Sequence, residues 1–338
     1  MWKQLIDNFR GYKMTNRICE ILGIEKPVIQ APLNWLTNAE LAGSVSKAGG
    51  LGVLGFNAGQ KDVAAFPEET IERMRGEIRK VREITNKPIG INVVPSSDVA
   101  TDIFTAPMLN LMVEEKVPVA IMVGTLDADW VLKFQQKGIK VVFRAENPGK
   151  KNTQEAVNAG VDVIVATGFD EGGTIPAKAI GTFSMIPMIV DAAEGKVPVM
   201  AAGGIVDSRG AQAAYALGAE GLYVGTAFLL SKESPLAANI KKMAIGMTAE
   251  DLLFYRTVPA YYRSLPGDLP NKLLDMSKGG ATEEQIYKEQ NGYIGMRDGM
   301  LLGDLTKGFA SFGLGITFIN KIESVSAIMD KLSTTANY

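Results

Sequence analysis

Two glycine-containing segments of this sequence carry the residue types that bind an anion through backbone amides. The first is MAAGGIVDS at 200–208, and the second is LYVGTA at 222–227. Each places glycine at the end of an apolar run, where the lack of a side chain lets backbone N–H groups approach a ligand closely. Thr226 adds a hydroxyl, and Asp207 or Ser208 can cap the helix that follows the first segment. We interpret both segments as parts of one phosphate site; the alternative is that their glycines only form tight turns.

A third glycine segment, GLGVLG at 50–55, matches the dinucleotide-binding pattern G-x-G-x-x-G literally. It follows a helical stretch at 38–48 and continues into a strand-like apolar run. The dinucleotide fingerprint needs the reverse order, strand then helix, so that the helix N-terminus faces the pyrophosphate. We therefore treat this match as a false positive. The sequence also lacks the G-x-x-x-x-G-K-[ST] pattern of a P-loop.

Several other chemistries are excluded by residue type. Cys19 is the sole cysteine and histidine is absent, so the chain forms no internal disulfide and no zinc site of thiolates or imidazoles. The same composition rules out a Ser-His-Asp or Cys-His nucleophile system. Carboxylates alone remain as ligands for a cation such as magnesium, and we predict no metal in the site.

The elements that must position the glycine segments form a regular series of apolar runs, each followed by a helical stretch. Nearly continuous apolar character is typical of strands covered on both faces, as in a parallel sheet. Eight such units favour a closed (β/α)8 TIM barrel over an open doubly wound sheet, which is the alternative. The two phosphate segments then follow strands seven and eight, where barrels frequently bind phosphate. The eight runs lie at 28–31, 52–55, 89–94, 119–124, 140–145, 161–168, 197–204 and 221–226.

The β–α rhythm also predicts how the chain is divided. We assign 14–246 together with 316–338 to the barrel and 247–315, which is rich in proline and glycine, to a small, mostly helical appendage near the barrel mouth. The chain then closes with a helix whose apolar residues share one face, and this helix completes the outer ring. Residues 1–13 are an N-terminal extension, either an amphipathic helix across the barrel bottom or a loosely attached segment. The apolar residues of the closing helix are Ile322, Val325, Ile328, Met329 and Leu332.

The composition limits the classes of binding partner that we expect. The chain has 338 residues, 46% of them hydrophobic, and a net charge of −2, so no nucleic acid or anionic membrane is expected as a partner. The N-terminus, MWKQLIDNFR, lacks a secretory apolar core, and no apolar stretch is long enough to span a membrane. We predict a cytoplasmic protein that binds a small-molecule substrate, with a homodimer left open.

Taken in their order along the chain, several motifs resemble those of a known family. The opening PVIQAPL at 27–33 and LAGSVSKAGGLG at 41–52 are similar to the start of nitronate monooxygenases, formerly called 2-nitropropane dioxygenases, a family that includes the flavin-type enoyl-ACP reductases. The resemblance covers about 15–231, and the order of the motifs is more specific than any one of them. The later motifs are GIN at 90–92, AGVD at 159–162, EGG at 171–173, AGGI at 202–205 and GT at 225–226.

The resemblance implies FMN as the cofactor, with NAD(P)H as a candidate co-substrate. Asn92 would hydrogen-bond the flavin ring from the third strand, and Gly172 and Gly173 would border it after the sixth. FMN fits better than FAD, because no segment resembles an adenosine-binding Rossmann unit. By the same resemblance, Ala31, Pro32 and Leu33 would line the isoalloxazine, and Gly203, Gly204, Gly225 and Thr226 would hold the phosphate.

Charged residues near the predicted ring site admit two interpretations each. Arg144 ends the fifth strand, where a cation would stabilise the anionic reduced flavin. Alternatively it is a solvated loop arginine beside Glu146. Asp170 and Glu171 either contact the cofactor or cap the turn that follows them.

One position departs from the family chemically. Thr174 stands where the family typically has histidine, directly after the Gly-Gly of the sixth βα loop, and threonine cannot act as a base near neutral pH. Thr174 therefore leaves the catalytic group unknown. A nitronate is already deprotonated, and NAD(P)H needs only hydride transfer to flavin. We therefore expect activity with nitronate or NAD(P)H and none with a neutral nitroalkane.

Other functions remain as alternatives. They are a flavin-dependent enoyl-ACP reductase, an NAD(P)H:quinone reductase, and a flavin-binding accessory protein that lacks catalysis. A barrel enzyme like inosine-monophosphate dehydrogenase needs a catalytic-loop cysteine, whereas Cys19 precedes the first strand. An aromatic and basic cluster in the appendage either grips an anionic substrate or only packs; it consists of Tyr255, Arg256, Tyr261, Tyr262 and Arg263.

Overall fold

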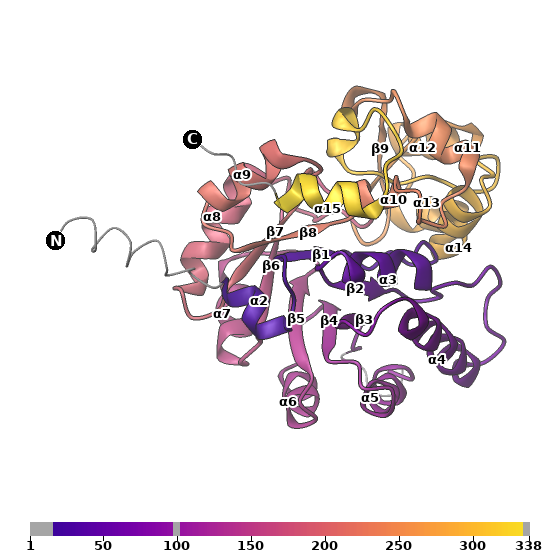
Figure 1. The fold of residues 1–338 in the computed structure, drawn as a ribbon. Coiled ribbons are helices and arrows are strands. Elements are labelled where there is room, and N and C mark those ends of the chain that lie inside the picture. Colours follow the sequence, from indigo (N-terminus) through magenta and orange to yellow (C-terminus); the bar gives the residue numbers. More distant parts are fainter. Residues whose placement is uncertain (1–15, 97–101, 334–338) are drawn as a thin grey trace.

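The computed structural model describes residues 16–96 and 102–333, and eight of its strands form one parallel sheet (Figure 1). In this sheet β1 pairs with β8, and the order then continues β7, β6, β5, β4, β3 to β2. A parallel bridge between Ile29 and Leu51 brings β1 next to β2 and closes the circle. This arrangement is a TIM barrel, so the predicted fold is confirmed and the open-sheet alternative is wrong. The strands are β1 (Val28–Gln30), β2 (Gly52–Leu54), β3 (Ile89–Val93), β4 (Val119–Gly124), β5 (Lys140–Ala145), β6 (Val163–Thr167), β7 (Val199–Ala202) and β8 (Gly221–Val224).

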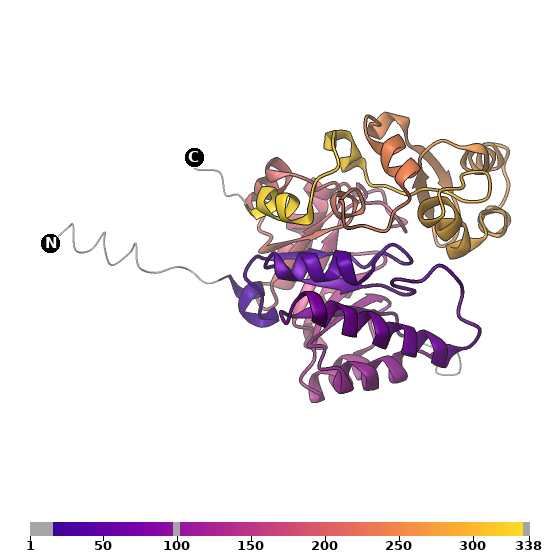
Figure 2. The ribbon, with the colours of Figure 1, turned by 45° about the vertical axis from the view of Figure 1, so that its right-hand side comes forward.

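Helices follow the strands and form the outer layer. The closing helix α15 (Val325–Ser333) packs against α3, α9 and β1 and buries Ile328, Met329 and Leu332, so the predicted completion of the outer ring is confirmed. Figure 2 shows α3, α4 and α5 side by side along one flank. The other ring helices are α3 (Ala39–Lys47), α4 (Pro67–Ile84), α5 (Thr105–Glu114), α6 (Ala128–Gln136), α7 (Lys150–Asn158), α8 (Thr182–Ala193) and α9 (Ser208–Ala216).

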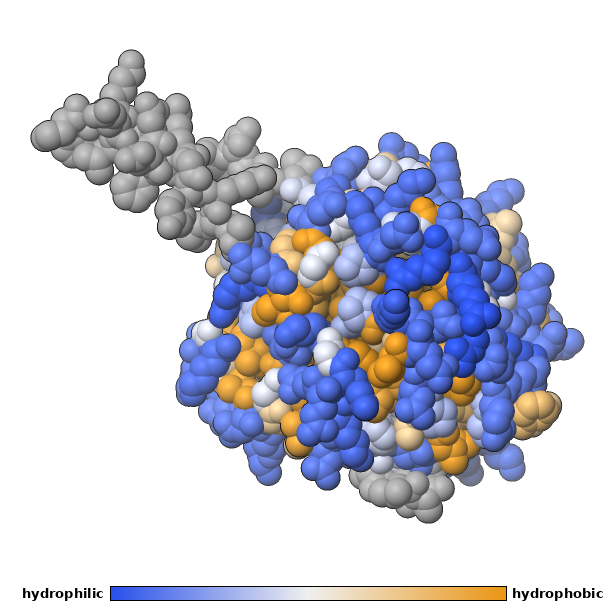
Figure 3. All heavy atoms as spheres, turned by 60° about the horizontal axis from the view of Figure 1, so that its bottom comes forward, coloured by the Kyte–Doolittle hydropathy of each residue, from blue (hydrophilic) through white to orange (hydrophobic). Residues whose placement is uncertain are grey.

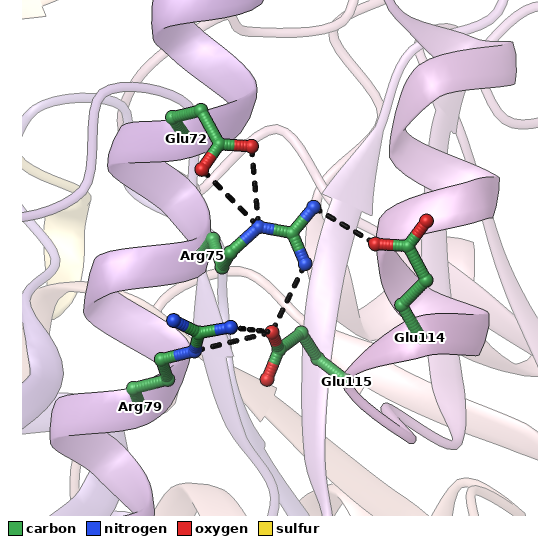
Figure 4. A network of polar contacts seen from close by, with 5 residues as sticks. All are labelled: Glu72, Arg75, Arg79, Glu114 and Glu115. Atoms are coloured by element: carbon green, nitrogen blue, oxygen red, sulfur yellow. Dashed lines mark hydrogen bonds and ion pairs between the residues drawn. The ribbon is translucent and has the colours of Figure 1, made fainter.

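A charged network ties α4 to α5 (Figure 4). The Arg75 guanidinium contacts Glu114 at 2.8 Å and Glu115 at 3.0 Å, and Arg79 contacts Glu115 at 2.9 Å. Most of these side chains are partly exposed, so each contact contributes about 1 kcal/mol or less to the free energy of unfolding. The network helps to fix α4, whose preceding loop lines the site described below.

The barrel interior is closed at the N-terminal ends of the strands by α2 (Arg17–Leu22). Ile18 and Leu22 of this helix pack against inward-facing apolar residues such as Ile29 and Val119. Figure 1 shows α2 at one end of the barrel and the appendage at the other. The two interpretations of residues 1–13 concern a segment outside the described residues. Apolar side chains thus cover the bottom of the barrel, and the cavity lies at the opposite, C-terminal ends of the strands.

The appendage residues Leu252, Leu265, Phe309 and Phe312 belong to an apolar cluster that also includes Trp35 of the loop after β1. Its helices agree with the expectation of a mostly helical region, but the structure adds an antiparallel hairpin of β9 (Leu253–Arg256) and β10 (Tyr261–Ser264) that the sequence did not predict. These strands are only four residues long, too short for a clear alternating pattern. The domain boundaries stay a prediction. The helices from β8 onward are α10 (Thr226–Leu229), α11 (Ala238–Ala244), α12 (Asp268–Lys278), α13 (Glu283–Gln290) and α14 (Gly292–Met296).

The described residues include no helix long and apolar enough to cross a membrane. Figure 3 shows one face of the molecule, where polar residues predominate and apolar ones lie scattered between them.

Candidate functional site

A cavity of about 750 Å³ lies at the C-terminal ends of the barrel strands, beneath the appendage. Its size is in the range of small-molecule and cofactor sites, and its position is that of TIM-barrel active sites. Thirteen of the residues that the sequence singled out for the site line this one cavity, although they come from six different strand ends, whereas Asp170 is not among the lining residues. These residues are Ala31, Pro32, Leu33, Asn92, Arg144, Glu171, Gly172, Gly173, Thr174, Gly203, Gly204, Gly225 and Thr226.

The glycine cradle, defined here as Gly203, Gly204, Gly225 and Thr226, follows β7 and β8. Gly203 has φ 110° and Gly204 has φ 71°, values that side chains rarely tolerate. A Cβ on Gly203 would also lie 2.4 Å from the Thr182 hydroxyl oxygen. Glycine is therefore required for this turn, and it leaves the backbone bare toward the cavity.

The helix after the first cradle segment begins as expected. Of the two candidate caps, Asp207 is the one used: its Oδ1 accepts hydrogen bonds from the backbone N–H groups of Arg209 at 3.0 Å and Gly210 at 3.3 Å. This cap sets where the chain leaves the barrel after Gly204.

The appendage packs its own backbone against the cradle. The Gly313 N–H donates to the Thr226 hydroxyl at 3.0 Å, and the Gly173 N–H donates to the Ser311 hydroxyl at 2.9 Å. A Cβ on Gly315 would lie 2.6 Å from the Gly204 carbonyl oxygen. This contact was not predicted from the sequence, although the close spacing of Gly313 and Gly315 indicates a tightly packed backbone.

Arg144 and Glu171 form a buried ion pair in the cavity wall. Arg144 Nη2 lies 2.5 Å from Glu171 Oε2, and the two side chains are 11% and 12% exposed. Burial acts to lower the pKa of Arg144, but the attraction of Glu171 outweighs it and raises that pKa. Arg144 is thus not a solvated loop arginine, and its partner is Glu171 rather than Glu146.

The neighbouring carboxyls Asp170 and Glu171 have separate roles. Asp170 Oδ2 accepts hydrogen bonds from the backbone N–H and the hydroxyl of Thr182, both at 2.6 Å, at the first residue of α8. Asp170 therefore holds the start of a helix. Glu171 instead lines the cavity, and its buried Oε1 has no hydrogen-bond partner among the described residues. Burial raises the pKa of Glu171 to about 7, although Arg144 and Arg263 act to lower it.

Thr174 is held by a tyrosine of the appendage. Its Oγ1 lies 2.9 Å from the Oη of Tyr262, which comes from β10 and lines the cavity. Burial raises the pKa of Tyr262, so this phenol stays protonated and can serve as a hydrogen-bond donor.

The remaining members of the predicted aromatic and basic cluster do not line the cavity. Tyr255 is buried in the apolar cluster of the appendage, and Arg256 is exposed. Arg263 turns back to the barrel, where its Nη1 donates to the Glu171 carbonyl oxygen at 2.7 Å and its guanidinium lies 4.8 Å from the centre of the Phe169 ring. These residues therefore pack within the protein or face solvent and do not form a common anion-binding site; Tyr262 is the exception, because it lines the cavity.

Other lining residues escaped the sequence analysis. Tyr223 of β8 faces the barrel interior, and its Oη is buried without a hydrogen-bond partner among the described residues. Its place between the oppositely facing Leu222 and Val224 was the signal that could have revealed it. Tyr293, Met296 and Met300 reach the cavity from the appendage, which no local pattern indicated.

Two further expectations concern sites elsewhere. In segment 50–55 the helix α3 precedes strand β2, and a Cβ on Gly52 would lie 1.9 Å from the Ala42 carbonyl oxygen. These glycines allow a helix to pack on a strand, which confirms that the dinucleotide match is false. Within the described ranges, no cluster of three or more side chains is arranged to hold a metal ion.

Comparison with known proteins gives consistent relatives. A family model described as nitronate monooxygenase matches residues 15–335. A nitronate monooxygenase of Pseudomonas aeruginosa is 33% identical over 301 residues, covering 77% of this chain and 81% of that protein. A (3aS,4S,5R,7aS)-5-hydroxy-7a-methyl-1-oxo-octahydro-1H-indene-4-carboxyl-CoA dehydrogenase of Rhodococcus jostii is 30% identical over 258 residues, covering 76% of this chain and 67% of that protein.

Two solved structures have a similar fold. FabK from Thermotoga maritima superposes with a TM-score of 0.80 at 27% identity, covering 95% of both chains. Nitroalkane oxidase from Streptomyces ansochromogenes superposes with a TM-score of 0.74 at 20% identity, covering 94% of this chain and 96% of that one, a likeness of fold alone.

Proposed function

The chain belongs to the nitronate monooxygenase family, and we propose that it is an FMN-dependent enzyme that oxidises alkyl nitronates or NAD(P)H. Membership of this family makes it a flavin-dependent oxidoreductase, against the alternative of an accessory protein without catalysis. The observation that supports the finer proposal is the gathering of all thirteen predicted site residues around one cavity.

The residues present fit the phosphate end of FMN. A Cβ on Gly225 would lie 3.8 Å from Leu33 Cδ2 and 3.9 Å from the Ala31 Cβ, both in the cavity wall, so glycine keeps this part of the cradle clear. Thr226 Oγ1 already accepts a hydrogen bond from Gly313, which leaves its hydroxyl proton to donate to a phosphate oxygen. Backbone amides and a hydroxyl would thus hold the phosphate without a charged side chain.

The ring end would meet both apolar and polar groups. Ala31, Pro32 and Leu33 would cover one side of the isoalloxazine. The Asn92 amide, which donates to the Ile121 carbonyl oxygen at 3.1 Å, would present a fixed polar group to the ring. Arg144 would favour the ring's added negative charge after reduction. When bound, the flavin supplies hydride and electron transfer, chemistry that no protein side chain provides.

The residue at 174 selects the proposed substrates. Thr174 donates or accepts a hydrogen bond but does not act as an acid or a base near neutral pH. We therefore expect substrates whose reaction requires no proton transfer to or from residue 174. An alkyl nitronate and a reduced nicotinamide both meet this condition. The likeness to FabK supports a second candidate, a flavin-dependent enoyl reductase, and an NAD(P)H:quinone reductase is a related alternative. Thr174 weighs against the enoyl reductase, which must protonate its product.

Turnover measured in parallel tests the proposal. The purified protein is loaded with FMN, and initial rates are compared in air with propyl-2-nitronate, with NADH or NADPH alone, and with NADH or NADPH together with an enoyl thioester. We expect FMN to bind and the nitronate or a nicotinamide to be consumed. A protein that takes up no FMN would contradict the cofactor assignment, and consumption of NAD(P)H only when the thioester is present would favour the second candidate. A cytoplasmic location and a homodimer are also proposed and need separate measurements.

A further inference from the structure

We propose that Glu171 is the base of this pocket, and that its carboxylate removes the α-proton of a bound nitroalkane so that a nitronate forms inside the enzyme. The inference rests on the proposed function, because the nitronate formed would be the substrate proposed above. It also revises the expectation from Thr174 that neutral nitroalkanes are not used. The base would lie three residues earlier in the same loop.

The backbone around Glu171 is held firmly enough to aim a side chain. Arg263 donates to the Glu171 carbonyl oxygen at 2.7 Å. Two residues later, the Gly173 backbone N–H donates to the Ser311 hydroxyl at 2.9 Å. A Cβ on Gly172 would lie 2.6 Å from the Gly313 nitrogen, so the appendage presses directly on this loop. Glu171 and Thr174 both line the cavity from this fixed turn.

The carboxyl group itself has one oxygen engaged and one without a partner. Oε2 pairs with Arg144, whereas the buried Oε1 has no hydrogen-bond partner among the described residues. A buried oxygen of this kind is costly unless a ligand or a proton satisfies it. By contrast, the adjacent Asp170 is occupied by Thr182 and lies outside the cavity lining.

The charged and titratable groups around Glu171 come from three strands. Arg144 of β5 and Arg263 of β10 lower the pKa of Glu171, but burial raises it more, to about 7. Tyr223 of β8 also faces the carboxyl, and burial keeps this phenol protonated by raising its pKa. A pKa near the working pH suits a general base, because the base is then both partly ionised and strong enough to accept a proton.

The proposed step balances without a further reagent. The α-C–H bond of the nitroalkane breaks, an O–H bond forms on Glu171, and the electron pair stays on the substrate, spread onto the nitro oxygens. The Thr174 and Tyr262 hydroxyls line the same cavity and offer donors for those oxygens. The carboxyl proton then returns to solvent. Oxidation of the nitronate belongs to the proposed function, with flavin and dioxygen as oxidants.

Proton exchange tests the step without any oxidation. FMN-loaded protein is incubated with nitroethane in D₂O without oxygen, and loss of the α-proton signal is followed by NMR against a buffer blank. We expect catalysed exchange, with a rate that rises with pH through about 7, and a loss of about 100-fold or more in Glu171→Gln. The matched control is Asp162→Asn, since Asp162 is 12% exposed and paired with Lys140 at 3.0 Å, at the start of β6.

The outcomes separate this inference from the proposed function. Equal exchange in wild type and Glu171→Gln, or no exchange above the blank in wild type, would overturn the assignment of the base. Should Glu171→Gln not fold, the wild-type pH profile and Glu171→Asp decide: a flat profile between pH 6 and 8 with full activity in the aspartate variant overturns it. Turnover of propyl-2-nitronate is measured separately, so exchange without nitronate oxidation would contradict the nitronate part of the proposed function and leave the assignment of the base intact.

Discussion

Two parts of the cavity wall differ in what they present to a ligand. The glycine cradle presents main-chain amides and one hydroxyl, and its shape depends on φ angles at Gly203 and Gly204. A second part of the cavity wall, called here the polar wall, consists of the side chains of Arg144, Glu171, Thr174 and Tyr262. Amides do not titrate, so the hydrogen-bond donors of the cradle stay the same over a wide pH range. The polar wall contains a carboxyl with a shifted pKa, so its charge changes near neutrality.

This contrast separates the binding of the cofactor from proton transfer with the substrate. A cofactor phosphate needs a constant set of donors, which backbone geometry provides at no cost in buried charge. A reacting substrate needs groups that gain and lose protons, which only side chains provide. Substitutions in the two parts of the wall should therefore fail in different ways, and the following predictions run from the largest expected effect to the smallest.

The largest effect is expected in the cradle. Gly203→Ala places a Cβ 2.4 Å from the Thr182 hydroxyl oxygen at φ 110°, so strain and overpacking together should cost about 4 kcal/mol of the free energy of unfolding. FMN affinity should fall with it, by the same factor at pH 6 and pH 8. Urea unfolding and flavin fluorescence titration measure the two quantities.

Gly138→Ala is the control for backbone strain. Gly138 has φ 75° and nothing within 4 Å of its ideal Cβ, and it lies before β5 at the other end of the barrel. We expect a loss of about 1 kcal/mol in the free energy of unfolding and no change in FMN affinity. If both variants bind FMN like wild type, the cradle does not hold the phosphate.

The next effect concerns the ion pair of the polar wall. Arg144→Met leaves Glu171 buried without its cation, which should cost about 3 kcal/mol at pH 8. In the folded wild type, the Glu171 carboxyl has a pKa of about 7 and is mostly protonated at pH 6, whereas in the unfolded chain its pKa is the ordinary 4.5. Removal of Arg144 therefore breaks an ion pair at pH 8 but leaves a mostly neutral carboxyl at pH 6, so the loss of stability should be smaller at pH 6. Urea unfolding at both pH values measures this.

The double variant Arg144→Met/Glu171→Gln sharpens that result. Removing both charges should recover part of the stability at pH 8 and abolish the difference between pH 6 and pH 8. A pH dependence that survives in the double variant would show that another group titrates.

The smallest effect is expected at the tyrosine pair of the hairpin. Tyr262 and Tyr255 lie opposite each other on β10 and β9, and both are buried. The Tyr262 hydroxyl pairs with Thr174, whereas that of Tyr255 has no partner among the residues that the structure describes. Tyr262→Phe should cost about 1 kcal/mol and weaken nitronate binding, seen as a raised KM. Tyr255→Phe should cost nothing in stability and leave KM unchanged. Equal effects of the two would remove Tyr262 from the site.

The barrel and its cradle could be predicted from the sequence because they depend on local patterns. Eight apolar runs specify strands buried on both faces, and the positions of Gly203, Gly204 and Asp207 at the end of one run specify a bare turn with a capped helix. These properties arise within a few residues, so no knowledge of distant contacts was needed.

The polar wall was decided by tertiary structure. Arg144 and Glu171 are 27 residues apart, Thr174 and Tyr262 are 88 apart, and each pair meets only after the barrel closes or the appendage folds over its mouth. The raised pKa of Glu171 likewise follows from burial and from the cations of β5 and β10, which no spacing in the sequence reveals. Residue type alone placed a carboxyl and a threonine in the loop; only their surroundings decided which of them can take a proton.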